Sequence, residues 1–393
     1  MKSLYDDSYA ETLGDSRLAM RVYTSQLLGQ SEDLVLHGGG NTSIKINDTL
    51  YVKGSGWNLA TIEEAGFSPV DLKVLQEMAT RDQLSDTQMV KEQRAALRDS
   101  GAPNPSIEAI LHAIIPFDFV DHTHADAVVT ISNTPDGREL IEEVYGDRVL
   151  IIDYVMPGFI LSEAIYEQTR ELDWSSIEGI ILLNHGIFTF NNDAKQSYEK
   201  MIELVTEAEQ FIYEAALMYP KCIAGHFKPD MLTELKETVS SLRGCDITIK
   251  TVDSINACSL SKHPNLEAIV HNGGLTPEHV IRIKPFPAII EQDVHSGINA
   301  FTEAYQAYFT AHASKHHVCL DLAPRYAIIK GVGAVAFGKD EKEAAVIADI
   351  VEHTIHAMLV AEHLGGWQSL NPAELFEMEY WELEQVKLKK GNR

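Results

Sequence analysis

The stretch that decides the fold is PSIEAILHAIIPFDFVDHTHAD, residues 105–126. Pro105 and Ser106 are typical of a helix start, because proline tolerates the first turn and a serine hydroxyl can cap free amides. Apolar residues then recur at helical spacing as far as the next proline, which predicts one buried helix face. The following FVDHTHAD predicts a short strand. Side chains two apart on a strand share a face, so we expect His122 and His124 side by side, able to bind one divalent metal.

A second segment adds a third histidine. Residues 179–190, GIILLNHGIFTF, form an apolar run that Asn184-His185-Gly186 interrupts. A buried strand normally carries Val, Ile or Leu at such a place, so His185 is not expected to be idle. The glycine lets the backbone approach a neighbour closely. Glu108 lies in the first turn of the predicted helix, where the helix dipole favours a charged carboxylate. Three histidines and one carboxylate predict a zinc site with room for substrate.

Composition indicates an acidic globular protein. The 393 residues suffice for two or three domains, and the contents of 45% hydrophobic and 23% charged residues are ordinary for a soluble protein. Lys+Arg 32 against Asp+Glu 58 gives a net charge of -26. Such a surface repels nucleic acid and anionic membranes, so neither is expected as a partner. An anionic substrate must therefore be met by a local cluster of donors.

Targeting and redox signals are few. The sequence contains no apolar run of eighteen or more residues and no N-terminal signal peptide. The cysteines lie far apart without a C-x-x-C pair, so we expect them to be reduced and mostly structural, in a cytoplasmic protein. They are Cys222, Cys245, Cys258 and Cys319.

Two glycine-rich turns suggest an anion site. Residues 34–57, LVLHGGGNTSIKINDTLYVKGSGW, predict strand, glycine-rich turn, strand, tight turn, strand and a second glycine-rich turn. The two glycine-rich turns, residues 38–43 and 53–56, are expected at the same end of the hairpin. Backbone amides, small hydroxyls and Lys53 suit a phosphate, and a hairpin without a ligand fits the pattern equally well. Neither G-x-G-x-x-G nor G-x-x-x-x-G-K-[ST] is present, so no dinucleotide or nucleoside triphosphate site is indicated.

The rest of the chain predicts further α/β units. We expect a helical N-terminus, a helical connection over residues 61–104, a strand at 149–152 and a long helix that Asp193 caps. His112 shares a helix face with Glu108 at i,i+4, but a histidine in such a position is more often packed or exposed than catalytic. His37, beside the first glycine-rich turn, could reach a substrate.

An internal similarity relates the two halves. GIFTFNNDAKQSYEKM (186–201) and GAVAFGKDEKEAAVIA (333–348) align at a shift of 147 residues, from 186 to 333. Both predict a strand, a turn and a capped helix, although such corners recruit similar residues anywhere. If the repeat is real, Val332 replaces His185, and the second copy is a scaffold without its own metal.

The motifs together resemble a known family. Gly40-Asn41-Thr42-Ser43, Gly54-Ser55-Gly56, Pro105-Ser106-Ile107-Glu108, His122-Thr123-His124 and Asn184-His185-Gly186 resemble, in order, those of the class II aldolase/adducin family. YVKGSGWNLATIE, APNPSIEAILHA, VDHTHADAV, YVMPGF, LTPEHVIR and MEYWELEQVKL resemble the aldolase part of bifunctional rhamnulose-1-phosphate aldolase/short-chain dehydrogenase proteins. Those proteins continue into a dehydrogenase where this sequence stops at Arg393, so no dehydrogenase activity is expected.

The resemblance implies roles for individual residues. It implies one zinc ion per chain, bound by His122, His124 and His185, and a catalytic Glu108 that can bind the metal or move aside to act as base. The implied phosphate-binding positions are Asn41, Thr42, Ser55, Gly56 and Ser106. Some members have a serine where this chain has Ile107, so one phosphate donor is missing here.

The implied reaction is zinc-dependent retro-aldol cleavage of a ketose 1-phosphate, with rhamnulose 1-phosphate as the sugar suggested by the resemblance, into dihydroxyacetone phosphate and an aldehyde. Two alternatives stay open. Pentulose-phosphate 4-epimerases resemble these aldolases in their histidines but have Asp in the position of Glu108. Adducin-like modules are not catalytic and have lost the metal ligands that this chain retains.

The resemblance also implies the architecture. Residues 1–225 are expected to form a three-layer α/β/α class II aldolase-like fold with a mostly antiparallel mixed sheet. Residues 226–393 are expected to form a second α/β domain. If the internal repeat is real, this domain is a degenerate, metal-free copy of the first. Relatives form ring-like homotetramers, so we expect a homo-oligomer with the site near a subunit interface.

Overall fold

The computed structural model describes residues 1–215, 222 and 225–383, so residues 384–388 of the quoted C-terminal motif lie outside the described part. The chain divides into two compact units, one of residues 1–132 and 137–213 and the other of residues 133–136 and 214–393. The division differs from the expected boundary at residues 225 and 226 in two ways: the change comes at residue 213, and residues 133–136 belong with the second unit. Asn133 explains the second difference, because its Nδ2 donates to the Leu275 carbonyl at 2.7 Å.

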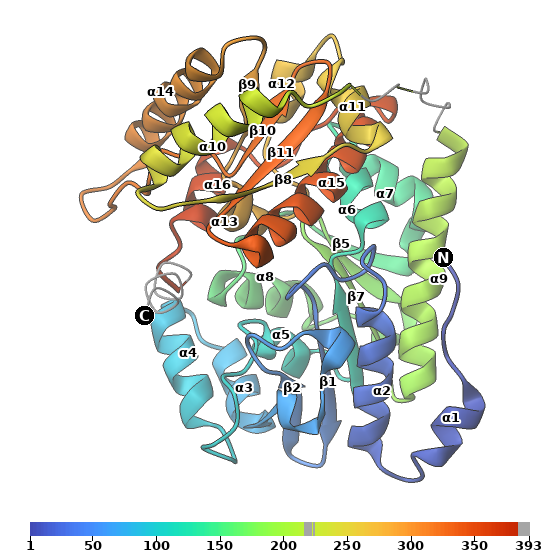
Figure 1. Cartoon of the computed structure of the whole chain (residues 1–393). Helices are drawn as coiled ribbons and strands as arrows, with labels where there is room; N and C mark the ends of the chain where they lie inside the picture. The colour runs from blue at the N-terminus through green and yellow to red at the C-terminus, as the bar shows by residue number, and fades with distance from the viewer. Residues whose placement is uncertain (216–221, 223–224, 384–393) are drawn as a thin grey trace. The chain divides into compact units, whose positions relative to one another are not determined.

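The first unit is built on a seven-stranded mixed sheet with the order β3-β2-β1-β4-β7-β6-β5 (Figure 1). Among its neighbouring pairs β5–β6 is parallel and the others are antiparallel, which confirms the expected mostly antiparallel sheet. The strands are β1 (Asn41–Ile46), β2 (Thr49–Lys53), β3 (Phe67–Asp71), β4 (Phe119–Thr123), β5 (Val149–Ile152), β6 (Gly179–Leu182) and β7 (Gly186–Asn191).

Helices cover both faces of this sheet (Figure 1). α2 and α9 lie on one face, and α3, α5 and α8 pack together on the other, which confirms the three-layer α/β/α class. The helices are α1 (Asp7–Thr12), α2 (Arg17–Gly29), α3 (Leu72–Ala79), α4 (Asp86–Ala95), α5 (Ala109–Ile114), α6 (Asp126–Ser132), α7 (Gly137–Tyr145), α8 (Phe159–Thr169) and α9 (Ala194–Ala215). Short 3₁₀ turns are η1 (Leu59–Thr61), η2 (Glu64–Gly66), η3 (Gly146–Arg148) and η4 (Trp174–Ser176).

A buried ion pair joins α2 to β4. Arg21 Nη2 lies 2.5 Å from Asp121 Oδ1, and both side chains are 0% exposed. Arg21 also donates to the Ser43 carbonyl at 3.3 Å, and Asp121 Oδ2 accepts from Ser197 Oγ at 2.5 Å. These additional bonds offset the cost of removing two charges from water. Because Asp121 precedes His122, the pair holds β4 from the face opposite the histidine.

Two segments differ from the predicted secondary structure. Residues 34–37, expected as a strand, form turns in which the Leu34 and Val35 amides both donate to the Ser31 carbonyl. Residues 67–71, inside the expected helical connection, form β3, which pairs with β2. Pairing with a neighbouring strand decides the conformation of such an edge segment, and local propensity does not reveal it.

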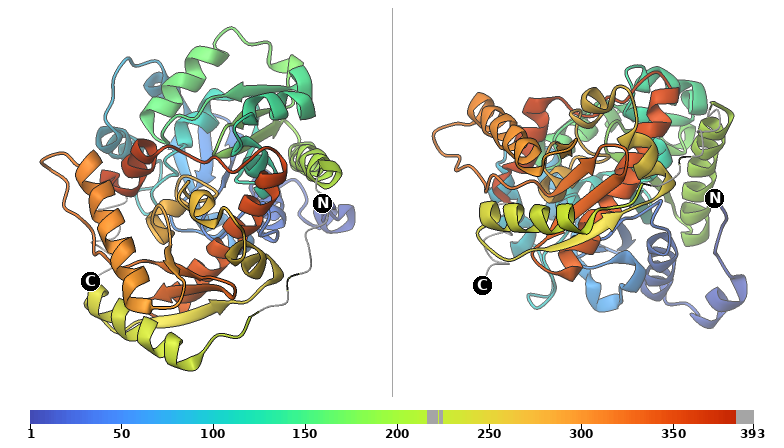
Figure 2. Two further views of the ribbon diagram at one scale, coloured as in Figure 1. Left: turned by 90° about the horizontal axis from the view of Figure 1, so that it is seen from above. Right: turned by 45° about the horizontal axis from the view of Figure 1, so that its top comes forward.

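The second unit contains a four-stranded sheet with the order β8-β11-β10-β9. α10, α14 and α16 share an apolar core with one face of it, while α11 and α15 pack against the other (Figures 1 and 2). The strands are β8 (Thr248–Val252), β9 (Ala288–Ile290), β10 (Tyr326–Ile329) and β11 (Gly333–Gly338). The helices are α10 (Pro229–Arg243), α11 (Ile255–Ser261), α12 (Leu266–Val270), α13 (His279–Ile283), α14 (Val294–His312), α15 (Glu341–His363) and α16 (Pro372–Glu379).

This second sheet repeats half of the first. The order and strand directions of β8-β11-β10-β9 match those of β4-β7-β6-β5. Matching backbone bonds recur: the Leu183 amide donates to the Ile152 carbonyl at 2.9 Å, and the Lys330 amide donates to the Ile290 carbonyl at 2.9 Å. Among the described strands of the second unit, none corresponds to β1, β2 or β3. The similarity therefore covers the half of the first sheet that carries the histidines.

Two of the four cysteines are paired. Cys222 and Cys258 form a disulfide, and Cys245 and Cys319 are free. This finding corrects the expectation that all four are reduced. The pair is 36 residues apart in sequence, and folding brings the two Cα atoms to 6.1 Å, a distance that spacing alone does not reveal.

One described helix, α15, is long and apolar enough to cross a membrane by length and composition. In the structure, 67% of its most apolar stretch is buried. It packs against β8, β10 and β11 of its own sheet. A helix that covers a sheet in this way needs the same apolar composition.

Replacing Arg21 by Met is expected to lower the free energy of unfolding by about 3–5 kcal/mol, since Asp121 is left buried and charged without its partner. Arg17→Met on the same helix is the matched control, because Arg17 and Asp118 are 42% and 38% exposed. An exposed pair of this kind contributes at most about 1 kcal/mol. Denaturant unfolding followed by circular dichroism measures both variants. Equal, small losses would contradict the role given to the buried pair.

Candidate metal and substrate site

Three histidines meet beside the ends of β4 and β7. His122 is in β4, His124 follows that strand, and His185 lies in the turn before β7. One ring nitrogen from each lies within 4.8 Å of those of the other two. The ring centroids of the three pairs are 4.9, 5.2 and 4.9 Å apart. This spacing allows three neutral imidazoles to bind one divalent cation.

His185 is delivered by a hairpin turn and not by an interrupted single strand. β6 and β7 are antiparallel, with Leu182 opposite Gly186. Asn184 has a φ of 59°, in the left-handed region that asparagine tolerates better than most residues. The His185 amide donates to the Leu182 carbonyl at 3.1 Å and closes the turn. The break in the apolar run was thus a turn signal as well as a ligand signal.

Gly186 allows this hairpin to lie against β4. A Cβ atom at Gly186 would lie 2.3 Å from the Thr123 carbonyl oxygen, 3.0 Å from the His122 ring and 3.2 Å from the His124 ring. No other residue fits without displacing the backbone. The close approach expected from the sequence is therefore an approach to the histidine-bearing strand itself.

The ring of His122 is held in the tautomer that a metal requires. Its Nδ1 lies 3.0 Å from the Ile187 carbonyl, which can only accept, so Nδ1 carries the proton. The lone pair of Nε2 is then directed toward His124, whose Nε2 is 3.1 Å away. Phe188 stacks on the His122 ring with centroids 4.1 Å apart and restricts its rotation. A backbone partner of this kind is usual for metal-binding histidines.

Glu108 completes the donor set. Its side chain is buried, with Oε2 3.6 Å from His122 Nε2 and Oε1 3.6 Å from His185 Nε2. Oε2 accepts from Asn41 Nδ2 at 2.6 Å, whereas Oε1 has no hydrogen-bond partner among the described residues. A buried carboxylate oxygen is costly unless a donor or cation is near it. Three imidazoles and this oxygen therefore fit a divalent metal.

The helix that follows Glu108 begins at Ala109, with Glu108 at the N-cap position. Pro105 and Ser106 were expected to start it, but residues 104–106 instead run beside residues 53–55 through backbone hydrogen bonds of 2.8 and 3.0 Å. These bonds keep the segment extended, so the helix starts later than the proline predicts. The Ser106 hydroxyl nevertheless accepts from the Glu108 amide at 3.3 Å, and so turns the chain into the helix.

The two loops joined by these backbone hydrogen bonds, at residues 53–56 and 104–106, carry most of the predicted phosphate-binding residues. Ser55 and Gly56 are exposed and Ser106 is half-buried. Gly56 has a φ of 87°, and no atom lies within 4 Å of the place a Cβ would take. Lys53 is 5% exposed, and its Nζ donates to the Gly38 carbonyl at 3.3 Å, which connects the two glycine-rich turns. Donors therefore gather where the two turns meet.

Asn41 and Thr42 are neighbours on β1 and point to opposite faces. The Asn41 amide reaches Glu108, whereas the Thr42 hydroxyl is 2.8 Å from Ser25 Oγ under α2. Side chains alternate along a strand, so the Thr42 side chain does not join the others. The structure thus brings the Asn41 side chain to the Glu108 carboxylate and places the Thr42 side chain on the opposite face of the sheet.

His112 was expected from the sequence to be packed or exposed, but the structure places it beside the candidate site. It is 0% exposed and is hydrogen-bonded to Asn41 and to Ser43. Burial lowers the pKa of His112 well below its usual value. The available signal was its i,i+4 spacing from Glu108, which places both on one helix face.

The second unit has other residues at the equivalent positions. Thr251 lies opposite Val335, as His122 lies opposite Phe188. Val332 occupies the position of His185 in the equivalent turn, because its amide donates to the Ile329 carbonyl as that of His185 donates to Leu182. Neither replacement offers a nitrogen ligand.

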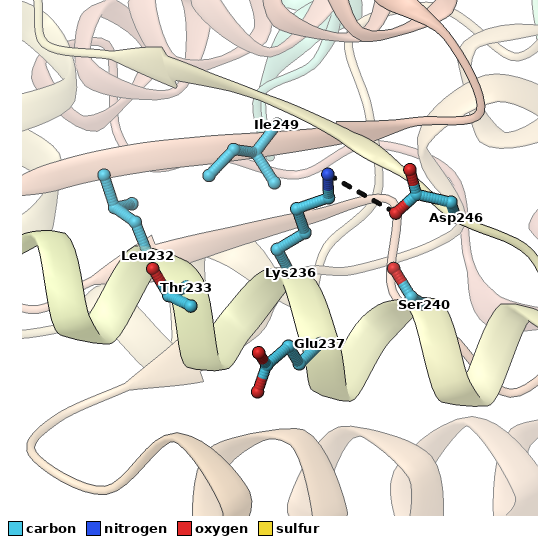
Figure 3. A pocket seen from close by; sticks show the side chains of 7 residues that line it. All are labelled: Leu232, Thr233, Lys236, Glu237, Ser240, Asp246 and Ile249. Carbon is cyan, nitrogen blue, oxygen red and sulfur yellow. Dashed lines mark ion pairs between the residues drawn. The ribbon is translucent and has the colours of Figure 1, made fainter.

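Figure 3 shows a shallow hollow of the second unit, between α10 and β8. Its lining residues are Leu232, Thr233, Lys236, Glu237, Ser240, Asp246 and Ile249. Lys236 Nζ points toward Asp246 at 3.3 Å. None of these side chains is buried and none is a histidine or cysteine, so the hollow offers no comparable chemistry.

Comparison with known proteins shows the family of this chain. The model of the class II aldolase and adducin N-terminal domain matches residues 21–212, and that of the aldolase class II second domain matches residues 227–388. The solved N-terminal class II aldolase domain of a conserved protein from Thermoplasma acidophilum is 35% identical, covering 54% of this chain and 99% of that chain, with a TM-score of 0.49. The chain belongs to the class II aldolase and adducin family.

Two further similar proteins differ in sequence identity and in how much of this chain they cover. The "uncharacterized oxidoreductase YuxG" of Bacillus subtilis (strain 168) is 32% identical over 406 residues, which cover 93% of this chain and 57% of that protein. The chain thus spans little more than half the length of this relative. L-fuculose-1-phosphate aldolase from Thermus thermophilus is 17% identical, covering 51% of this chain and 95% of that chain, with a TM-score of 0.35.

Metal-free protein is expected to bind one divalent ion per chain, and His185→Ala is expected to abolish that binding, because two imidazoles alone hold a cation weakly. His295→Ala is the matched control, since His295 is a surface histidine with 65% of its side chain exposed. Elemental analysis after equilibrium dialysis measures both. Unchanged metal content in the His185 variant would place the ion elsewhere.

Proposed function

We propose that the protein is a zinc-dependent aldolase that cleaves a ketose 1-phosphate into dihydroxyacetone phosphate and an aldehyde. The observation that carries this proposal is the buried Glu108 carboxylate, directed at three histidines that fit a metal. When bound, zinc would supply a Lewis acid that polarises the ketose carbonyl. Membership of the family supports an aldolase. The resemblance in the sequence makes rhamnulose 1-phosphate the first sugar to test.

Glu108 is the group to which we assign proton transfer at the enediolate carbon, which is carbon 3 of the ketose. Its Oε2 is held by Asn41, while Oε1 has no hydrogen-bond partner among the described residues. A carboxylate with one anchored and one available oxygen can exchange a proton without losing its position. In the cleavage direction the hydroxyl on carbon 4 loses its proton as the bond between carbons 3 and 4 breaks, and Glu108 would deliver one proton to carbon 3; in the condensation direction Glu108 would remove that proton from dihydroxyacetone phosphate.

We assign the phosphate to the loops at residues 53–56 and 104–106. The Ser55 and Ser106 hydroxyls and the Gly56 amide would be the donors there, because the Ser55 and Ser106 amides already donate to the Asn104 and Lys53 carbonyls. A chain with a net charge of -26 also needs local positive charge to attract an anion. Lys53 supplies it, and its contribution matters more because Ile107 has no hydroxyl. The proposal also includes a homo-oligomer, as the family implies, and a cytoplasmic location.

The reaction is tested by dihydroxyacetone phosphate release from a panel of ketose 1-phosphates, with a chelator and with zinc added back. Release that the chelator abolishes and zinc restores is the expected result, and the best substrate identifies the sugar. Interconversion of sugar phosphates without release would indicate an epimerase. If zinc is bound and no ketose 1-phosphate in the panel is converted, the proposed reaction is rejected.

Glu108→Gln is expected to retain the metal and to lower turnover by about 10²- to 10⁴-fold, the usual contribution of a general acid or base. Glu11→Gln, an exposed carboxylate on α1, is the control and should leave turnover unchanged. Metal content and kcat are measured on the same preparations. Unchanged turnover in the Glu108 variant would remove this residue from the mechanism.

Lys53→Met is expected to lower kcat/KM for the phosphorylated ketose by about 10- to 100-fold, chiefly through KM, because a charged hydrogen bond to the phosphate is lost. Lys73→Met is the control, since Lys73 has 81% of its side chain exposed. The same assay with an unphosphorylated ketose should show no difference between the two variants. An equal loss on both ketoses would contradict a role in phosphate recognition.

A further inference from the structure

His112 lies in the middle of a buried chain of hydrogen bonds that ends at Glu108. Its Nδ1 is 2.8 Å from Ser43 Oγ, and its Nε2 is hydrogen-bonded to Asn41 Oδ1. Asn41 and Ser43 are two apart on β1 and so share the face that α5 covers. The ring edge also meets Phe188, with centroids 5.6 Å apart. Both ring nitrogens are thus engaged inside the protein.

The chemistry of the partners fixes the direction of every bond in this chain. A carboxylate only accepts, so Asn41 must present its NH₂ group to Glu108, at 2.6 Å. The Asn41 oxygen then faces His112, and because that oxygen only accepts, His112 Nε2 must carry the ring proton. His112 Nδ1 is left to accept from the Ser43 hydroxyl. The four groups are consistent with one tautomer of a neutral ring.

The opposite orientation of the Asn41 amide would break two contacts at once. Its oxygen would face the Glu108 carboxylate, and its NH₂ would face the N–H of His112. Rotation about a single side-chain bond exchanges these two ends of the amide. The proton on His112 therefore makes one orientation favourable and the other repulsive, in a buried place where water does not compensate.

We propose that His112 is a positioning residue for Glu108 and acts through Asn41. Its Nε2 proton selects the orientation in which Asn41 donates to Glu108 Oε2, and Oε1 stays directed at His185. His112 does not touch the reacting atoms. This role rests on the proposed function of Glu108 as the carrier of the substrate proton.

The ring tautomer tests the hydrogen-bond chain without any substrate. Long-range ¹H–¹⁵N correlation on the metal-loaded full chain, labelled in its histidine rings, reports which nitrogen carries the proton. His112→Gln identifies the signal by its loss. The expected result at neutral pH is a ring protonated at Nε2 and not at Nδ1. A ring protonated at Nδ1 alone, or at both nitrogens, would overturn the proposal.

A double-mutant cycle tests whether His112 acts through Asn41. His112→Phe is expected to lower kcat by about 10- to 100-fold, as losing a group that orients a reacting side chain does, with KM little changed. The variant with both His112→Phe and Asn41→Ala should have the kcat of Asn41→Ala alone, because among the described residues Asn41 is the one that joins the His112 ring to the Glu108 carboxylate by hydrogen bonds. Losses that multiply in the double variant would overturn the proposal.

Two further variants separate positioning from packing. His112→Gln keeps an N–H donor and should recover part of the kcat lost in His112→Phe, and equal losses would count against the proposal. His279→Phe replaces a buried histidine of α13, 7% exposed, and should leave kcat unchanged. If the wild-type protein turns over no ketose 1-phosphate, the proposed function fails. The tautomer is then still measurable and by itself decides on the hydrogen-bond chain.

Discussion

The antiparallel pairing of β1 with β4 is the contact on which the candidate site depends. Its register places Asn41 opposite His122 and Thr42 opposite Asp121. Because side chains alternate along both strands, the first pair faces α5 and the second faces α2. One face of the sheet thus carries the side chains that could bind a metal and transfer a proton. The other face holds the buried ion pair of Arg21 and Asp121, which stabilises the strand without entering the site.

The second unit separates what the fold requires from what the chemistry requires. A Cβ atom at Gly333 would lie 2.6 Å from the Val252 carbonyl, just as one at Gly186 would lie 2.3 Å from the Thr123 carbonyl. The glycine is kept where the equivalent of His185 is Val332, so it serves the packing of the hairpin against its neighbouring strand. The histidines are not needed for the strand arrangement, because the second unit forms the same arrangement without them.

Local patterns in the sequence were sufficient for much of this structure. Alternation and apolar periodicity predicted individual strands and helices, and the spacing of His122 and His124 predicted neighbouring rings. The mixed sheet between helix layers was implied by the family resemblance. The patterns failed where a distant segment competed for the backbone. Residues 104–106 bond to a neighbouring loop before α5 starts, and β3 exists only through its pairing with β2. The disulfide between Cys222 and Cys258 likewise depends on folding.

The sequence by itself determined which side chains are available: three histidines, a carboxylate and two glycine-rich turns, at spacings that strands and helix starts make usable. Only the tertiary structure decided which of their atoms meet. Thr42 faces away from the site and His112 faces into it because of the register between β1 and β4 and the placement of α5 over one face. The physical reason is that propensity and periodicity act over a few neighbouring residues, whereas hydrogen bonds between strands set the positions of side chains far apart in the chain.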